Sequence, residues 1–591
     1  MKKSIITMLL LAVALIANAV PAKRGWQTRT QADGTTIEVQ LVGDEFCHYW
    51  INRNGQEVRE VNGVFKVVGD EPTPLQVRAR RAKTQARRQH KAVGVKPNLA
   101  PKGVVILANF NDAKMEDAHT HDVFDELCNS ANCTVNSYNG TNYPSAGEYF
   151  KAQSDGQYHP QFDVFGPVTL SRDYAFYGHN IIIEEQEQDE FATDAAIEAC
   201  ILAKQQFPEL NFADYDSDKD GYVDFVYVIY AGKGEADGGD ANTIWPHNWE
   251  ITYAVYPYNE DGQYDPVNGT RSSCCYTEDD VLIDGVRLSN YAMSSELEGG
   301  GTLSGIGTLC HEFGHVMGLP DFYDTNYADN YKNRLTPSEW NIMDSGSYNG
   351  GGHCPPNYDP WEKFFMGWIT PQNLGTYGRR LTLKANGTEG YKAYQINAGG
   401  KQQKSTENGL CYYIENRQQQ GWDKFVPASG MLIWKVDFDE QAWTYNAPNN
   451  TANKPRYTLV IPSGTKIGSN YGEKNVWPYG STNSWEGVSG KPLKDITRSG
   501  NDIKLIYIED ITSYKVQWIV NGELLESREY NLDGSEDLVL PTAAVEACEG
   551  TTFIGWATES EWCNPFVAPE DLFTEPTGKV TEPVTYYAVF E

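Results

Sequence analysis

The pattern of apolar and polar positions changes several times along the 591-residue chain. Continuous apolar runs at 103–110 (GVVILANF) and 224–232 (DFVYVIYAG) predict buried strands. Segments 144–156 and 189–206 carry apolar residues at helical spacing. Because strands and helices are mixed in this way up to about residue 370, the pattern predicts an α+β or α/β domain.

Helical spacing becomes scarce after about residue 376. Segments 411–417, 430–438 and 456–462 resemble strands, so we expect residues 376–512 to form a β-rich domain. The tail contains three aromatic-rich strands, YKVQWIVNG, TFIGWATES and VTYYAVFE, joined by polar loops. These strands predict a separate small module over residues 513–591.

The first residues combine a basic start with an apolar run. Two lysines precede a run that ends at Ala17, and Ala17-Asn18-Ala19 has the small-x-small form of a signal-peptidase site. The run is too short to cross a bilayer, so it predicts a signal peptide over residues 1–19, with a buried N-terminal helix as the alternative. No later stretch reaches about 18 apolar residues. We therefore expect a secreted protein, extracellular or associated with the cell envelope, without a transmembrane segment.

Two segments of different composition follow the predicted signal peptide. Residues 24–70 alternate apolar and polar positions between turn signals such as DG and NRNG, which predicts small antiparallel strands. Residues 76–91, QVRARRAKTQARRQHK, are strongly basic. Such a run is either a solvated face or a linker whose exposed Arg-Arg pairs are open to cleavage.

The overall charge restricts the class of partner. The chain carries 80 acidic against 48 basic residues, for a formal net charge of −32. A surface of this sign repels nucleic-acid phosphates, so we expect no nucleic-acid partner, and cations are favoured instead. The 11 cysteines lack a zinc-binding spacing, and their odd number leaves at least one thiol unpaired within the chain.

Residues 310–321, CHEFGHVMGLPD, carry the strongest chemical signal in the chain. His311 and His315 are four residues apart, so a helix would present both imidazoles on one face to a single ion. Glu312 would reach a water on that ion without binding the ion itself. This arrangement predicts a zinc ion with Glu312 as general base.

The residues after this helix predict the third ligand. Gly318 can adopt a left-handed conformation, which ends a helix and lets the chain fold back. The turn would bring Asp321 under the metal, and a carboxylate is an accepted zinc ligand. A distant carboxylate such as Glu362 is the alternative. With three protein ligands, a catalytic Zn²⁺ keeps a fourth position for water.

The motif HEFGHVMGLPD, followed by NIMDSG at 341–346, resembles the immune inhibitor A family of secreted zinc metallopeptidases, which has metzincin-like features. Further blocks, including GVVILANFND and DPWEKFFMGWI, extend the resemblance over roughly residues 100–465. It implies a metzincin-like zinc peptidase domain over residues 101–375, with a mixed sheet and an active-site helix. It also places Met343 at the methionine turn beneath the metal. Asp321 stands where usual metzincins have a third histidine.

Two flanking segments are similar to known modules. Residues 39–58 resemble the propeptides of relatives, and residues 513–591 are similar to the β-grasp repeats of internalin-like bacterial surface proteins. We therefore expect residues 20–100 to form a small β-rich inhibitory propeptide with a basic linker. The C-terminal module is expected to contact a cell surface or a glycan.

A second metal site is predicted at residues 214–224, DYDSDKDGYVD, which follow the spacing of an EF-hand calcium loop. Glycine stands at loop position 6, and Tyr227 replaces the glutamate of position 12, so a full helix-loop-helix is not expected. A solvated acidic turn is the alternative to a structural Ca²⁺. The predicted calcium residues are Asp216, Asp218, Asp220, Tyr222 and Asp224.

These features predict a secreted zinc-dependent endopeptidase that is made as a latent precursor and hydrolyses proteins or peptides. His247 and Tyr348 are weaker candidates for substrate contact, and Cys47 for thiol-to-zinc latency, although a buried cysteine is the simpler interpretation. A surface adhesin with a structural zinc is the alternative from another functional class. An adhesin needs no general base, so the presence of Glu312 argues against this alternative. A hydrolase acting on other acyl groups is a third hypothesis.

Overall fold

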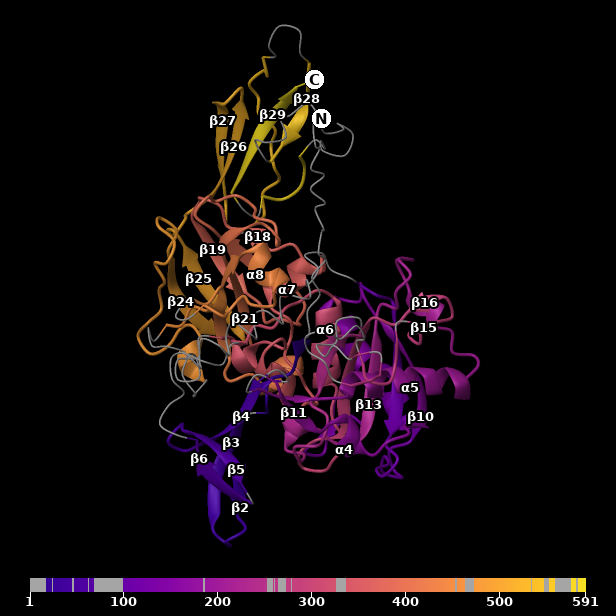
Figure 1. Ribbon diagram of the computed structural model, residues 1–591. Helices are drawn as coiled ribbons and strands as arrows, with labels where there is room; N and C mark the ends of the chain where they lie inside the picture. The colour runs from indigo at the N-terminus through magenta and orange to yellow at the C-terminus, as the bar shows by residue number, and fades with distance from the viewer. Residues whose placement is uncertain are drawn as a thin grey trace, which may run out of the picture.

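The computed structural model describes most of the chain in the conformation drawn in Figure 1. The described residues are 18–23, 25–44, 47–61, 63–68, 99–183, 186–251, 259, 261–263, 273–277, 279–325, 336–451, 454–462, 472–532, 534–546, 552–558, 576–580 and 583–590. Most of the predicted signal peptide, the basic segment 76–91 and the side chain of Cys47 lie outside them.

A six-stranded mixed sheet forms the centre of the α+β region, in the order β1-β14-β17-β13-β7-β10. Four neighbouring strands run parallel, β14 is antiparallel to β17, and β1 is antiparallel to β14. The strands β7 and β13 are largely apolar because both faces of the sheet are covered. The strands are β1 (Asn18–Ala19), β7 (Lys102–Asn109), β10 (Gln161–Thr169), β13 (Val226–Lys233), β14 (His247–Glu250) and β17 (Asn290–Leu297).

Helices and short hairpins surround this sheet. The predicted helices at 144–156 and 189–206 are present as α3 and α5, and Ser145 caps α3 by accepting a hydrogen bond from the Glu148 amide. The helices are α2 (His121–Asn129), α3 (Ala146–Gln153), α4 (Tyr174–Tyr177), α5 (Ala192–Gln206), α6 (Gly307–Val316) and α7 (Pro360–Phe365). The hairpins pair β8 (Ser137–Tyr138) with β9 (Thr141–Asn142), β11 (Asn180–Ile183) with β12 (Gln186–Asp189), and β15 (Leu282–Ile283) with β16 (Val286–Arg287).

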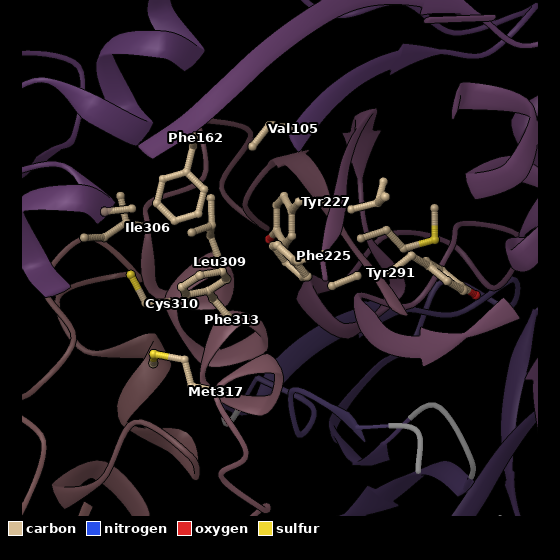
Figure 2. Close-up of a cluster of buried hydrophobic side chains, with 14 of the residues drawn as sticks. Val105, Phe162, Phe225, Tyr227, Tyr291, Ile306, Leu309, Cys310, Phe313 and Met317 are labelled. Atoms are coloured by element: carbon tan, nitrogen blue, oxygen red, sulfur yellow. The ribbon is translucent and has the colours of Figure 1, made fainter. Parts of the chain in front are cut away.

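An aromatic cluster fixes helix α6 against the sheet (Figure 2). The ring of Phe313 meets those of Phe162 and Phe225 edge-on, each with a centroid distance of 5.2 Å. Leu309, one turn earlier, faces the same cluster. Since these side chains are fully buried and interlocked, the helix has little freedom to rotate. The opposite face of α6 is thereby aimed away from the sheet.

The N-terminal region forms its own antiparallel sheet, in the sequential order β2 to β6. This sheet agrees with the short strands predicted over residues 24–70. In Figure 1 it lies at the end of the molecule opposite to the C-terminal module. Its strands are β2 (Gln27–Thr30), β3 (Thr36–Asp44), β4 (Cys47–Asn52), β5 (Glu57–Val61) and β6 (Val64–Val67).

The β-rich region consists of two sheets, in the orders β18-β20-β21-β22-β23 and β19-β25-β24, and its first strand, β18, lies just before residue 376. Its apolar interior continues into the α+β region: Tyr457 of β23 stacks on Phe322 at 3.6 Å between ring centroids. The two regions therefore share one core. The elements are β18 (Gln372–Asn373), β19 (Arg379–Leu383), β20 (Tyr394–Ile396), β21 (Gly409–Arg417), β22 (Gly430–Phe438), α8 (Glu440–Thr444), β23 (Tyr457–Leu459), β24 (Leu493–Ser499) and β25 (Asp502–Tyr507).

The C-terminal module is a four-stranded sheet in the order β27-β26-β29-β28, with a core around Trp518 and Trp556. The three aromatic-rich strands are present, and a fourth strand, β27, was not predicted because its sequence ELLESREY is largely polar. The strands are β26 (Tyr514–Val520), β27 (Glu523–Tyr530), β28 (Phe553–Ala557) and β29 (Val584–Phe590). No helix among the described residues has the length and apolar character needed to cross a membrane.

Candidate active site

Helix α6 brings two imidazoles together. The rings of His311 and His315 lie 4.7 Å apart between centroids, and their Nε2 atoms are 3.1 Å apart. The Nδ1 atom of His311 is 2.7 Å from the Ile342 carbonyl oxygen, and that of His315 is 2.8 Å from the Leu319 carbonyl oxygen. Each carbonyl accepts a hydrogen bond from an Nδ1–H, so the Nε2 atom of each neutral ring is unprotonated. The two Nε2 lone pairs can then bind one metal ion.

The turn after α6 places a carboxylate between the two imidazoles. Gly318 has φ 97°, a left-handed conformation that suits glycine, and the Leu319 amide donates back to the Gly314 carbonyl. The chain then returns under the helix, where Asp321 Oδ1 lies 3.4 Å from His311 Nε2 and 3.3 Å from His315 Nε2. Three potential ligand atoms from two short segments therefore converge on one point.

Asn446, from the β-rich region, holds the other side of the Asp321 carboxylate. Its Nδ2 donates to Asp321 Oδ2 at 2.7 Å, and its Oδ1 accepts from the Asp321 amide at 2.6 Å. Asn446 follows α8 and adopts φ 48°, a left-handed conformation that asparagine tolerates. This pairing occupies Oδ2 and leaves Oδ1 for the imidazole side.

The three converging groups fit a zinc ion. Asp321 Oδ1 is buried and receives no hydrogen bond from the described residues, which is costly unless a cation lies beside it. Burial lowers the pKa of His315 to about 4, so that ring is neutral at pH 7. Burial also opposes charge on Asp321, yet the neighbouring imidazoles hold the pKa of its carboxyl below its ordinary range. Burial opposes charge on His311 as well, but the hydrogen bond to the Asp321 carboxylate and the nearby acids raise the pKa of that imidazole above its ordinary value. A zinc ion bound here would displace that proton, and two neutral imidazoles with an ionised carboxylate form a donor set that zinc accepts.

Glu312 lies beside these groups on the same helix. It is fully buried, and its carboxylate oxygens lie within 4.8 Å of the ligand atoms offered by His311 and His315. This proximity is what the predicted general base needs. The structure therefore brings together the residues of the predicted motif.

Met343 lies directly beneath α6. A Cβ atom added to Gly314 would lie 2.6 Å from Met343 Sδ, so only a glycine in the helix permits this contact. The Met343 carbonyl accepts a hydrogen bond from the Phe322 amide, next to Asp321, and the preceding Ile342 carbonyl contacts His311. This turn thus touches both the helix and the returning segment.

Glu362, the alternative third ligand, has a structural role. It stands in the first turn of α7 in a capping box, where its Oε2 accepts from the Asp359 amide at 2.8 Å. The carboxylate that lies between the imidazoles is that of Asp321. The geometry therefore favours Asp321.

The candidate ligands His311, His315 and Asp321 lie in a segment that matches a known peptidase family. Residues 105–370 match the model of the family described as immune inhibitor A peptidase M6, catalytic domain. The chain is 28% identical over 260 residues to pre-pro-metalloprotease PrtV of Vibrio cholerae serotype O1, covering 40% of this chain and 26% of that protein. It is 26% identical over 245 residues to immune inhibitor A of Bacillus thuringiensis subsp. alesti, covering 38% and 32%.

Residues 105–370 form a peptidase M6 domain. The predicted resemblance to the immune inhibitor A family is thereby confirmed over this segment. The chain spans only about a quarter to a third of the length of these two relatives. Asn446 lies outside the matched segment, so the M6 domain as matched does not contain every residue that contacts its candidate ligands.

The predicted calcium loop lies at the start of strand β13 in the M6 domain. Asp216, Asp218 and Asp220 offer carboxylate oxygens within 4.8 Å of one another. Asp216 also accepts from the Gly221 amide, and Asp224 Oδ2 accepts from the Ser217 amide at 2.9 Å. Gly221 has φ 92°, as the sharp turn of such a loop requires.

The Tyr222 amide donates to Asp220 Oδ1 at 2.8 Å, and Tyr222 forms an isolated bridge with Arg287 of β16. The five predicted calcium residues are thus gathered in one loop.

The N-terminal segment 18–23 lies along the M6 domain. β1 adds to the edge strand β14, with Asn18 opposite Asn248 and Ala19 opposite His247. Beyond it, the Val20 carbonyl accepts from Trp245 Nε1 at 3.2 Å, and the Pro21 carbonyl accepts from the Tyr348 hydroxyl at 2.9 Å.

The two weaker candidates differ in their surroundings. Burial, with Asp237 and Glu312 nearby, raises the pKa of Tyr348 well above its ordinary value, and its hydroxyl contacts the N-terminal segment. His247 is engaged in the interior: Nδ1 is 2.6 Å from the Trp245 carbonyl oxygen, and Nε2 is 3.0 Å from the Tyr291 hydroxyl. Tyr348 is therefore the better placed of the two to meet an extended peptide.

Proposed function

We propose that this protein is a secreted zinc-dependent endopeptidase with a metzincin-like active site, made as a latent precursor. The observation that carries the proposal is the convergence of His311, His315 and Asp321 on one point beside Glu312, within an M6 domain. The names of the matched relatives, a pre-pro-metalloprotease and immune inhibitor A, support the same class of activity.

The chemistry assigns a role to each residue. His311, His315 and Asp321 hold the ion, which supplies an acidified water and polarises a peptide carbonyl when bound. Glu312 takes the proton from the attacking water and delivers it to the leaving amine nitrogen. Asn446 keeps the Asp321 carboxylate oriented, because it fixes Oδ2 and the backbone amide together.

Protein or peptide substrates would bind in extended form along β14. The support for this is β1, whose main chain pairs with this edge strand in the way that β-strand addition recognises peptides, although Asn18 and Ala19 belong to the predicted signal peptide. The Tyr348 hydroxyl and Trp245 Nε1 would donate to substrate carbonyl oxygens as they do to Pro21 and Val20.

Latency would follow from the residues that stay beside the M6 domain. With residues 1–19, and therefore strand β1, removed as a signal peptide, residues 20–100 would form the propeptide. Its residues 20–23 would remain against Trp245 and Tyr348 until the basic linker 76–91 is cleaved. A backbone hydrogen bond links this segment to the N-terminal sheet, because the Ala22 amide donates to the Gly43 carbonyl. The segment is therefore tied to the sheet that anchors it.

The proposal includes a role for a second metal ion and a role for the C-terminal module. A Ca²⁺ ion at Asp216, Asp218, Asp220, Tyr222 and Asp224 would stabilise the loop that precedes β13. The C-terminal module would contact a cell surface or glycan.

Casein digestion tests the central proposal. We expect the activated protein to cleave casein, to lose the activity on chelation and to regain it with added zinc. The Glu312→Ala variant should bind zinc and remain inactive, because the ligands are unchanged. A matched control, Glu209→Gln, removes an exposed charge and should cleave normally. A zinc-loaded, activated protein that cleaves no protein substrate would contradict the proposal and favour a structural zinc.

A further inference from the structure

A lysine of the N-terminal segment lies between two carboxylates of the M6 domain, Asp237 and Glu298, which together are called the acidic pocket. Lys23 Nζ lies 3.2 Å from Asp237 Oδ1 and 3.2 Å from Glu298 Oε2. Its backbone amide donates to the Ala236 carbonyl at 3.2 Å, so the main chain is fixed at the same position. The Lys23 ammonium also lies 5.9 Å from the centroid of the Tyr348 ring, whose hydroxyl contacts Pro21. The acidic pocket therefore adjoins the path of the segment along the M6 domain.

Both acids belong to neighbouring loops of the M6 domain. Asp237 ends a short 3₁₀ helix at Glu235–Asp237, and Glu298 follows strand β17. The two loops are in close contact, since a Cβ atom on Gly299 would lie 2.2 Å from the Asp237 carbonyl oxygen. The Thr302 hydroxyl donates to Glu298 Oε1 at 2.6 Å, which leaves Oε2 directed at the lysine.

Asp237 depends on a cation in this pocket. Its side chain is only 10% exposed, and Oδ1 receives no hydrogen bond from any described residue, so the ion pair with Lys23 is its compensation. Burial raises the pKa of Asp237, and the Lys23 ammonium acts in the opposite direction. When the segment leaves, two carboxylates would remain side by side with their cation gone. Such a pocket favours any ligand that restores a positive charge.

We propose that Asp237 and Glu298 form a substrate subsite for a lysine or arginine side chain, at the position that Lys23 takes in the N-terminal segment. This inference rests on the proposed peptidase function. It defines the preferred substrates as peptides with a basic residue at one fixed distance from the cleaved bond. The segment 20–23 then inhibits as a substrate-like ligand, with its lysine as the specific contact.

Sequencing of peptides released from a proteome-derived library tests the specificity. The activated enzyme should show lysine and arginine enriched about tenfold at one position, because a charge pair in a partly buried pocket discriminates strongly. Glu298→Gln should largely abolish the enrichment, and Glu298→Lys should shift it towards acidic residues. The control Glu209→Gln should keep it. Cleavage without a basic position, or with the same preference in Glu298→Gln, would overturn the inference.

A binding measurement on the full chain separates this inference from the proposed function, because it needs no catalysis. Lys23→Ala empties the pocket, and n-butylammonium chloride is then the probe. We expect the amine to raise the Tm of Lys23→Ala more than that of the wild type, and to have no such effect on Lys23→Ala/Glu298→Gln. An equal response of all three proteins would overturn the subsite even if casein is cleaved. A selective response would support it even if casein is not.

Discussion

The side chain of Asn446 forms two hydrogen bonds with Asp321, one to its carboxylate and one to its backbone amide, across 125 residues of sequence. The β-rich region therefore takes part in building the candidate metal site. It also shares an apolar core with the M6 domain through Tyr457 and Phe322. We infer that the two regions act as one unit.

Removal of this contact should weaken metal binding. Asn446→Ala is expected to lower zinc affinity by about 10- to 100-fold, the usual cost of losing a residue that orients a ligand. Competition with a chromophoric chelator measures this directly. Asn450→Ala is the matched control, because Asn450 contacts Thr325 and not Asp321. Equal zinc affinities in Asn446→Ala and the wild type would show that the asparagine does not position Asp321.

The contact between Gly314 and Met343 predicts an unusual effect of alanine. In an exposed helix, Gly→Ala stabilises by about 1 kcal/mol. At Gly314 the new Cβ would lie 2.6 Å from Met343 Sδ, so we expect Gly314→Ala to destabilise by about 1–3 kcal/mol through overpacking. Chemical denaturation measures the change. Adding Met343→Ala to Gly314→Ala should recover part of the loss; no loss in the single variant would mean that the helix is not fixed by this contact.

The acidic loop predicts a calcium-dependent stability. In saturating Ca²⁺ the wild type should melt about 5–10 °C above its value with a calcium-selective chelator, as a ligand at about 100 times its Kd contributes roughly 2.7 kcal/mol. Asp216→Ala should remove most of this difference, because Asp216 is the buried member of the cluster. Asp214→Ala, in the same segment but outside the five predicted ligands, is the control. An unchanged melting temperature on chelation would exclude the structural calcium.

Latency should depend on His48 of the N-terminal sheet. Its ring stacks on Trp245 at 4.5 Å, and its Nε2 lies 3.3 Å from Glu235 Oε1 of the M6 domain. His48→Ala is expected to raise the activity of the uncleaved precursor about tenfold, since losing the stack and the partner of a buried carboxylate costs about 1–3 kcal/mol.

Precursor and processed enzyme are compared on a fluorogenic peptide. Arg53→Ala, which breaks an exposed pair with Glu38 within the N-terminal sheet, should leave precursor activity low. If the His48→Ala precursor were as inactive as the wild-type precursor, the contact of His48 with Trp245 and Glu235 would have no part in latency.

The parts predictable from sequence are those set by local geometry. The spacing of His311 and His315 follows from the helical period, and Gly318 could be assigned its left-handed turn because few other residues adopt one. The long apolar strands could be predicted because strands buried on both faces of a sheet form continuous runs of apolar residues. Chain-local rules suffice for these features.

The remainder depends on contacts between distant segments. Nothing in the sequence around Asn446 indicates that it meets Asp321, and Lys23 carries no signal that distinguishes it from other lysines near the N-terminus. Strand β27 was not predicted, because its residues are largely polar and its strand conformation is fixed by pairing with β26. Such features are fixed by tertiary packing, which a single sequence does not reveal.

Metal content is the most direct test of the account. Purified wild-type protein, analysed by inductively coupled plasma mass spectrometry after dialysis, should contain one zinc ion per chain, and Asp321→Ala should lose most of it while Glu362→Ala, where it folds, retains it. A wild-type chain without zinc, or an Asp321→Ala chain with its full complement, would contradict the central claim.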